Sequence, residues 1–277
     1  MKNIQVRVLN PEAVVDSEKT MVAMARLTQR AEKIGNMEDF LTLLNKPYTE
    51  TTVENMTVLP HPTIQKFGVI NIAIVGASRR FLAQITRHQN EVKFMSGSLQ
   101  YSDYSGAAQF VVPYAITKMD AEKPILGPYD QPYPDYWTAQ YLKSCEQAFA
   151  EYEAAIKAGL DNDAAGYMMP QGLRNVLMIS ATPFQWKHMI SQRICNRNSL
   201  ETQYVMLKCW EELDTLSVMF NGIGPSCIQH SSCNEGKMSC KHFLYDAAVS
   251  DYMQQHDCGL PTAILDTKFE LIRRKEV

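Results

Sequence analysis

Polar residues in one short stretch of the chain have the types and spacing of a ligand site. Gln84, Arg87 and His88 lie three and four residues apart, so a helix would place them on one face. An arginine and a histidine presented together at a helix end can bind an anion or polarise a carbonyl group. Ser98 follows Gly97, so backbone and hydroxyl donors could face a phosphate together. The same pattern would suit a solvated helix end with a capping histidine, because cations are favourable there.

The composition indicates an ordinary globular protein and excludes some classes of partner. The chain has 277 residues, of which 45% are hydrophobic and 21% charged, which suffices for a sizeable core. A formal net charge of -3 and scattered basic residues argue against nucleic-acid binding. The chain has no run of about 18 apolar residues, so we expect no membrane span. Its first residues lack the apolar centre of a signal peptide. We expect a cytoplasmic protein.

Apolar patterns predict one domain of mixed α/β class over residues 1–277, with a Cys-rich tail from about residue 222. Residues 67–75 and 176–180 have the composition of buried strands. The expected helices are 18–45 with a break near Gly35, one capped by Ser78 that leads to His88, about 135–158, Thr182-Pro183 to Arg193, and about 199–220. The prolines of residues 107–135 predict irregular chain.

The stretch that contains Gln84 resembles the signature of flavin-dependent thymidylate synthases. That signature runs Gln-x-x-Arg-His-Arg, then seven residues, Ser, one residue and Arg-Tyr. The residues that match it are Gln84, Arg87, His88, Ser98 and Tyr101. Gln89 and Gln100 stand where the signature has arginines, and one extra residue lies between its two halves.

Further fragments in matching order extend this resemblance over about residues 20–245. They are Ala25, Arg26 and Thr28, His61-Pro62-Thr63, Met169-Pro170, Arg193, Arg197 and Glu201. Gly166 and His188 stand where the family has an arginine and an asparagine. Each fragment is short, but their order and spacing together are specific.

The resemblance implies a central sheet with flanking helices and a homotetramer whose active sites are each built from several subunits. Members of the family bind FAD and a pyrimidine nucleotide. NADPH and methylenetetrahydrofolate are their co-substrates, and the flavin carries the redox chemistry. The implied reaction is methylation at C5 of dUMP, or of a close variant such as dCMP or UMP.

The resemblance also implies roles for individual residues. Arg87 and Arg193 would be catalytic, because guanidinium groups at the pyrimidine oxygens stabilise developing negative charge. The nucleotide would contact Gln84, Arg87, Ser98, Gln100, Tyr101, His188 and Arg193. The flavin would contact His61, Thr63, Arg87, His88 and Gln89.

The departures from the family pattern concentrate where ligands would bind. Two arginines that contact the nucleotide in the family are replaced here by Gln100 and Gly166. Their loss would weaken phosphate binding unless another basic residue compensates. Lys187 and Arg174 are candidates for that compensation. A non-catalytic relative that binds a nucleotide or a flavin, or only assembles, is the alternative. The retained Arg87 motif favours the enzyme.

A second group of residues could bind zinc. The segment CIQHSSCNEGKMSCKH supplies the soft ligands Cys227, His230, Cys233, Cys240 and His242. It resembles a Cys-rich tail of some family members, which adds Cys195 as a fourth thiol ligand. Partly buried thiols kept for packing are the plain alternative. A small zinc-dependent nucleotide hydrolase or deaminase is a third function, for which Glu235 is the nearby acid.

Overall fold

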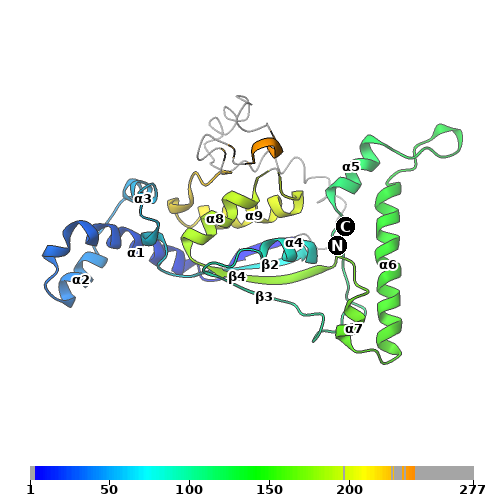
Figure 1. The fold of residues 1–277 in the computed structure, drawn as a ribbon, viewed down its shortest axis with the longest axis horizontal. Coiled ribbons are helices and arrows are strands. Elements are labelled where there is room, and N and C mark those ends of the chain that lie inside the picture. Colours follow the sequence, from blue (N-terminus) through cyan, green and yellow to red (C-terminus); the bar gives the residue numbers. More distant parts are fainter. Residues whose placement is uncertain (1–3, 196, 226, 228–232, 234, 241–277) are drawn as a thin grey trace.

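A four-stranded antiparallel sheet forms the centre of the molecule. The computed structural model describes residues 4–195, 197–225, 227, 233 and 235–240. The strands lie in the order β1-β2-β4-β3. Their bounds are β1 (Gln5–Val8), β2 (Ile70–Ser78), β3 (Val92–Ser96) and β4 (Arg174–Ala181). Figure 1 shows helices above this sheet and at both of its ends, so the expected mixed fold with flanking helices is confirmed.

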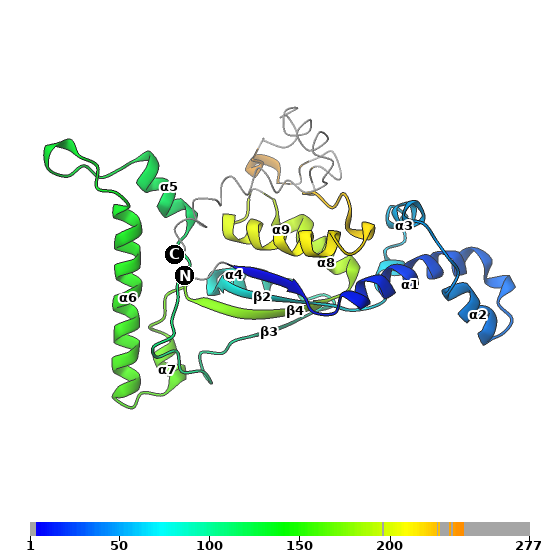
Figure 2. The ribbon, with the colours of Figure 1, turned by 180° about the vertical axis from the view of Figure 1, so that it is seen from behind.

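The two central strands divide an inner face from an outer face. Side chains alternate along a strand, and the paired residues Ile72 and Ile179 are fully buried on the inner face. The outer face is also apolar but exposed. Its exposed apolar residues are Val75, Met95, Val176 and Met178. Figures 1 and 2 show no helix of the described residues beneath this face. The sheet therefore presents an open hydrophobic surface.

Three helices cover the inner face of the sheet. They are α4 (Arg79–Ile85), α8 (Pro183–Arg193) and α9 (Leu200–Asp214). Phe81, Trp186 and Trp210 pack from these helices into the main core. Each helix begins after a hydroxyl residue whose side chain accepts a hydrogen bond from the backbone N–H three residues later. These caps are Ser78, Thr182 and Ser199, as the sequence predicted.

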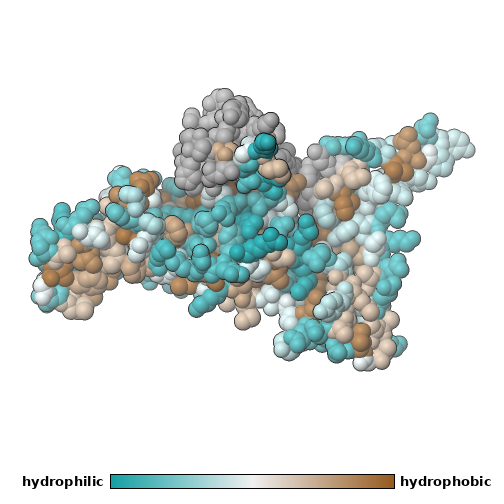
Figure 3. Space-filling view, viewed as in Figure 1, coloured by the Kyte–Doolittle hydropathy of each residue, from teal (hydrophilic) through white to brown (hydrophobic). Residues whose placement is uncertain are grey.

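Other helices extend the molecule beyond the sheet. At one end lie α1 (Pro11–Arg30), α2 (Met37–Leu44) and α3 (Glu50–Thr57), and at the other α5 (Tyr114–Glu122), α6 (Tyr136–Lys157) and α7 (Asn162–Gly166). Short 3-10 helices are η1 (Ala31–Lys33), η2 (Pro62–Gln65), η3 (Pro128–Asp130), η4 (Val218–Phe220) and η5 (Gly236–Met238). Figure 3 shows hydrophobic residues at the surface over α2. No helix within the described residues is long and apolar enough to span a membrane.

A second, smaller core lies where α6 and α7 meet. Buried Phe110, Tyr152 and Leu173 belong to it, and the Tyr152 hydroxyl accepts a 3.0 Å hydrogen bond from the backbone N–H of Tyr104. This core fixes the chain that leads out of β3. It therefore positions the loop that carries Ser98.

The structure corrects several expected elements. The first helix begins at Pro11 instead of residue 18, and the last ends at Asp214 instead of about residue 220. The first predicted strand runs from Ile70 to Ser78, three residues later than expected. The prediction of irregular chain over residues 107–135 is wrong for α5. Prolines bound that helix instead of interrupting it: Pro113 is its N-cap, and Pro124 follows its C-cap residue.

Candidate functional site

The ends of α4 and α8 carry the central residues of the predicted site. Arg87 and His88 follow α4, and Arg193 ends α8. The start of α4 is anchored by Glu201, whose carboxylate accepts hydrogen bonds from the backbone N–H of Ser78 over 2.7 Å and from its hydroxyl over 2.6 Å. Burial raises the pKa of Glu201, and these hydrogen bonds oppose that rise. Glu201 thus serves the scaffold of the site.

The Arg193 guanidinium joins the ends of the two helices. Its Nε donates to Nε2 of His88 over 2.8 Å, and its Nη2 donates to the backbone carbonyl of Gln84 over 3.0 Å. Its Nη1 donates to Oδ1 of Asn198 over 3.2 Å. All three partners are neutral groups, so the positive charge of Arg193 is oriented by them and not cancelled. A guanidinium held in this way can attract a negatively charged ligand.

His88 is held as a neutral imidazole. It is 7% exposed. Burial lowers its pKa to about 4, with further contributions from the charges of Arg193 and His188. Because Nε2 accepts the hydrogen bond from Arg193, the ring proton lies on Nδ1. The His188 ring meets the His88 ring edge-on at 5.9 Å, and burial also lowers the pKa of His188.

The Gln84 amide is oriented by the start of α9. Its Oε1 accepts hydrogen bonds from the Thr202 hydroxyl over 2.5 Å and from the Ser199 hydroxyl over 3.2 Å. Thr202 is fully buried, so its hydroxyl cannot turn toward solvent. With the oxygen occupied, a ligand would meet the amide nitrogen of Gln84, which is a hydrogen-bond donor.

Arg87 lies exposed beside this group. Burial lowers the pKa of Arg193, and the nearby charge of Arg87 lowers it further. Two guanidinium groups close enough to repel one another favour an anion between or beside them. Gln89 is also exposed. The structure therefore brings together Gln84, Arg87, His88, His188 and Arg193.

The residues predicted to bind phosphate lie in a different cavity. Ser98 and Gln100 line a space of about 540 Å³ beside α7. Gly166 lines it as well, and a Cβ at that position would come within 3.0 Å of the Leu99 Cβ. Tyr101 is 81% exposed and is not among the lining residues. Arg193 belongs to another cavity, so within one chain the predicted nucleotide site is split in two.

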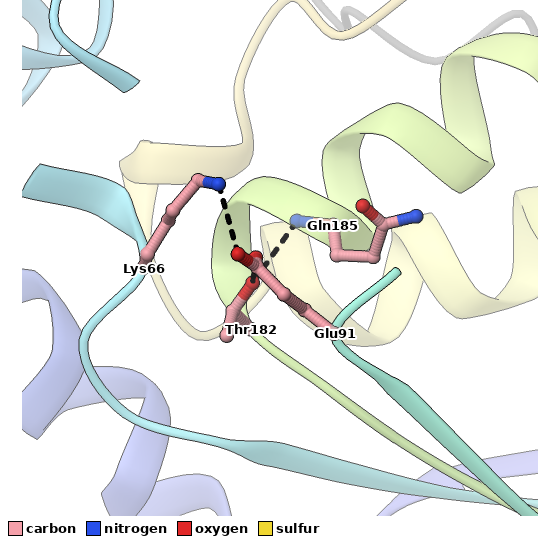
Figure 4. Close-up of polar contacts among 4 residues, drawn as sticks. All are labelled: Lys66, Glu91, Thr182 and Gln185. Atoms are coloured by element: carbon pink, nitrogen blue, oxygen red, sulfur yellow. Dashed lines mark hydrogen bonds and ion pairs between the residues drawn. The ribbon is translucent and has the colours of Figure 1, made fainter. Parts of the chain in front are cut away.

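His61, the N-cap of η2, and Thr63 within η2 are both exposed. Polar contacts connect the end of η2 to the start of α8. Lys66, just after η2, forms a 2.8 Å ion pair with Glu91, and Glu91 accepts a 3.2 Å hydrogen bond from the hydroxyl of Thr182 (Figure 4). Thr182 in turn accepts from the backbone N–H of Gln185. Arg193 lies at the opposite end of α8, which has 11 residues and is therefore about 16 Å long.

The predicted metal ligands share one cavity. Four thiol residues, together with Glu235, line a space of about 340 Å³ that also contains Arg193. They are Cys195, Cys227, Cys233 and Cys240. Among the described residues, however, no group of three or more potential ligands is arranged to hold a metal ion. His230 and His242 lie outside the described residues.

Three residues of these sites were missed by the sequence reasoning. Asn198 and Thr202 orient Arg193 and Gln84, and Arg79 lines the cavity that contains Ser98. Asn198 and Thr202 both lie within five residues of Glu201, so that motif could have drawn attention to them. Arg79 belongs to no matched fragment, and only the folded chain places it beside Ser98.

Comparisons with known proteins agree with the signature. A family model described as Thymidylate synthase complementing protein matches residues 12–216. A flavin-dependent thymidylate synthase from Thermococcus onnurineus (strain NA1) is 25% identical over 187 residues, which are 64% of this chain and 69% of that protein.

Two solved structures share the fold. The UMP/dUMP methylase PolB from Streptomyces cacaoi, bound with 5-Br dUMP, has a TM-score of 0.60 and 17% identity, covering 79% of this chain and 94% of that one. Thymidylate Synthase X from Helicobacter pylori, with FAD and dUMP, has a TM-score of 0.54 and 14% identity, covering 80% and 99%. At these identities the structures show the fold alone. The family model, however, spans most of the chain, and this protein therefore belongs to the thymidylate synthase complementing family, that of the flavin-dependent thymidylate synthases, as a divergent member.

Proposed function

We propose that this protein is a flavin-dependent methyltransferase that acts at C5 of a pyrimidine nucleotide, either dUMP or a close variant such as dCMP or UMP. Methylenetetrahydrofolate would donate the one-carbon unit and NADPH the electrons. The observation that carries the proposal is the joining of Arg87, His88 and Arg193 with Gln84 in one polar group. Gln84, Arg87 and His88 match the family signature, and Arg193, which lies about a hundred residues later, matches a further family fragment.

The chain's own residues suit the binding of an electron-rich ring. Arg193 and Arg87 would face the pyrimidine oxygens and stabilise negative charge that develops there. The Gln84 amide nitrogen would donate a further hydrogen bond. His88, kept neutral, would hold the Arg193 guanidinium in place without adding a competing positive charge.

The same group fits a flavin. Its donors and exposed cationic Arg87 suit the carbonyl and phosphate groups of FAD, and His61 and Thr63 present further polar side chains at the surface. When bound, FAD would pass two electrons from NADPH, which with a proton convert the transferred methylene to a methyl group. The protein supplies binding, orientation and charge.

We also propose that the active site is shared between subunits of a homotetramer. In one chain, Ser98 and Gln100 line one cavity and Arg193 another, so a second chain would have to complete each nucleotide site. The exposed apolar residues of the outer sheet face offer a surface for such an assembly.

Mixing two inactive variants tests the shared site. Ser98→Ala and Arg193→Ala should each be inactive alone, yet a reassembled mixture should regain part of the activity, because some sites combine two intact halves. Light scattering would report the number of subunits. A mixture that forms mixed tetramers but stays inactive would contradict a shared site.

The alternative function is a non-catalytic nucleotide- or flavin-binding protein. The loss of arginines at Gln100 and Gly166 favours it. An absorbance spectrum of the purified protein, a titration with pyrimidine monophosphates, and mass spectrometry of the products separate the two. Bound oxidised flavin together with a 5-methyl product would support the enzyme. A colourless protein that takes up no added FAD would exclude it.

A structural zinc ion is a separate proposal. The cavity lined by Cys195, Cys227, Cys233 and Cys240 has the ligand type that zinc prefers. As placed, the described residues do not form a metal-binding group, so the sulfur atoms would have to move together around the ion. We assign zinc no step in the reaction. Metal analysis of the purified protein is the direct test.

A further inference from the structure

The cavity beside α7 is lined by a half-buried arginine, Arg79, that forms no ion pair with another described residue. Arg79 is the first residue of α4, and its backbone N–H donates to the carbonyl of Leu173 over 3.0 Å. Arg79 lines the 540 Å³ cavity together with Ser98 and Gln100. Its Nη1 atom is buried and has no hydrogen-bond partner within the described residues.

Such an arrangement is costly for a residue with a purely structural role. A guanidinium always carries its charge. A buried donor without a partner gives up its hydrogen bonds to water and makes no others, which costs free energy. Asp163 lines the same cavity but forms no ion pair with Arg79 in the described part of the chain. Among the described residues that line the cavity, Arg79 is the only basic one.

The two residues that the sequence suggested for compensation are engaged elsewhere. Arg174 donates from Nε to the carbonyl of Gly76 over 3.0 Å, and Lys187 donates to Oε1 of Gln65 over 2.8 Å. Neither lines the cavity that contains Ser98. The cation available to a ligand in this cavity is therefore that of Arg79.

The polar groups around Arg79 suit an oxyanion. The Ser98 hydroxyl oxygen accepts a 3.1 Å hydrogen bond from the backbone N–H of Gln100, which leaves the hydroxyl proton for another acceptor. Gly97 allows close packing here, since a Cβ would come within 2.7 Å of Oδ1 of Asn175. Two residues that line the cavity, Arg79 and Ser98, thus carry a guanidinium and a hydroxyl, both of them donors.

We propose that Arg79 binds the 5′-phosphate of the pyrimidine nucleotide and replaces the arginines that positions 100 and 166 lack. The inference rests on the proposed function for the identity of the nucleotide, but the anion site itself does not. It makes Arg79 a specificity residue: it distinguishes a nucleoside monophosphate from the bare nucleoside. Arg79 lies outside every fragment that matches the family signature.

Calorimetric titration of the full-length protein with dUMP, deoxyuridine and inorganic phosphate tests this role. Arg79→Gln should weaken dUMP binding by about tenfold to a hundredfold, the worth of a charge-assisted hydrogen bond, and leave deoxyuridine binding unchanged. Arg79→Lys should recover part of the affinity. Arg80→Gln is the matched control, because Arg80 is the exposed neighbour. The melting temperature of Arg79→Gln should not fall, since the substitution removes a buried donor that has no partner among the described residues.

The outcomes separate this inference from the proposed function. If Arg79→Gln binds dUMP as tightly as the parent protein, Arg79 is not the phosphate ligand, although the methyltransferase proposal stands. If the parent binds no pyrimidine nucleotide but binds inorganic phosphate in a way that requires Arg79, the anion site stands and the proposed function fails. If the parent binds none of dUMP, UMP and dCMP and no inorganic phosphate, both are overturned.

Discussion

Arg193 donates a 2.8 Å hydrogen bond to Nε2 of His88, a residue 105 positions earlier in the chain. This bond joins the end of α8 to the end of α4. As an acceptor, Nε2 carries no proton, so the imidazole must be neutral, which agrees with the lowering of the His88 pKa to about 4. The positive charge of the pair therefore resides on the arginine, where a ligand can meet it.

Removal of the Arg193 guanidinium should abolish nucleotide binding and leave the fold intact. Arg193→Ala should lower the affinity for pyrimidine monophosphates by at least about a hundredfold, because charge-assisted contacts are lost. Titration calorimetry measures the loss, and circular dichroism checks the fold. Arg30→Ala, at the exposed end of α1, is the control. If the Arg193 variant bound every nucleotide that the parent binds with equal affinity, the assignment would be wrong.

The burial of His88 predicts a specific loss of stability in acid. The unfolded chain protonates this histidine near pH 6.5, whereas the folded protein does so only near pH 4. The unfolded state thus binds more protons between these values, and the free energy of unfolding should fall as the pH drops from about 6.5 to 4. For one residue the fall is up to about 3 kcal/mol. Urea unfolding at several pH values measures it.

A variant isolates that contribution. His88→Asn cannot titrate in this range, so its free energy of unfolding should depend less on pH between 4 and 6.5. His188→Asn serves as the comparison, because exposed His188 should contribute less. Equal pH dependence in the parent and in His88→Asn would show that His88 is not buried in its neutral form.

The Thr202 hydroxyl should matter for ligand binding although it lies behind Gln84. Thr202→Val keeps the shape but removes the donor that fixes the Gln84 amide oxygen. We expect pyrimidine binding to weaken by about tenfold and stability to fall by about 1 kcal/mol. Thr215→Val, which removes an exposed hydroxyl after the end of α9, is the control. Unchanged binding in Thr202→Val would mean that the orientation of Gln84 does not serve the ligand.

An arginine restored at position 100 should strengthen phosphate binding. Gln100 is exposed and lines the cavity with Arg79, so Gln100→Arg adds a second cation there. The affinity for a nucleoside monophosphate should rise by about tenfold, while that for the nucleoside stays constant. Gln131→Arg adds the same charge at the exposed residue that follows η3, outside the cavity, and should change neither affinity. A weaker monophosphate affinity would place the phosphate elsewhere.

Chelation should test the thiol cavity independently. If the cysteines hold zinc, a strong chelator should lower the melting temperature, because metal binding contributes to the stability of the fold. Cys233→Ser should reduce both the bound metal and the response to the chelator. Cys209→Ser, in the main core, should keep the bound metal. A melting temperature that the chelator leaves unchanged would indicate plain thiols.

Local signals in the sequence were sufficient for most of the inner layer. Ser78, Thr182 and Ser199 were predicted as caps because their hydroxyls act within four residues of chain. The strand β3 was missed because its residues alternate between partly and fully exposed, as an edge strand's do, and lack the continuous apolar run of β2. Its position depends on pairing with β4, which is distant in sequence.

The site was predictable where a motif names its own residues and not where the fold supplies them. Gln84, Arg87, His88 and Arg193 were recognised by type and spacing, and the structure unites them. Arg79 could not be found in this way, because its relevance depends on the cavity walls, which come from segments near residues 98 and 166. The split between two cavities also has no trace in the sequence.

Gly166 bears on the order in which substitutions can occur in this chain. A larger residue there would crowd Leu99, whose Cβ is fixed to its backbone, so that loop would first have to move. Gln100 is exposed at the cavity, so a larger residue there meets no such restriction. An evolutionary return to the family's charge pattern is therefore accessible in one step at residue 100, whereas at residue 166 it is contingent on an earlier change in a neighbour.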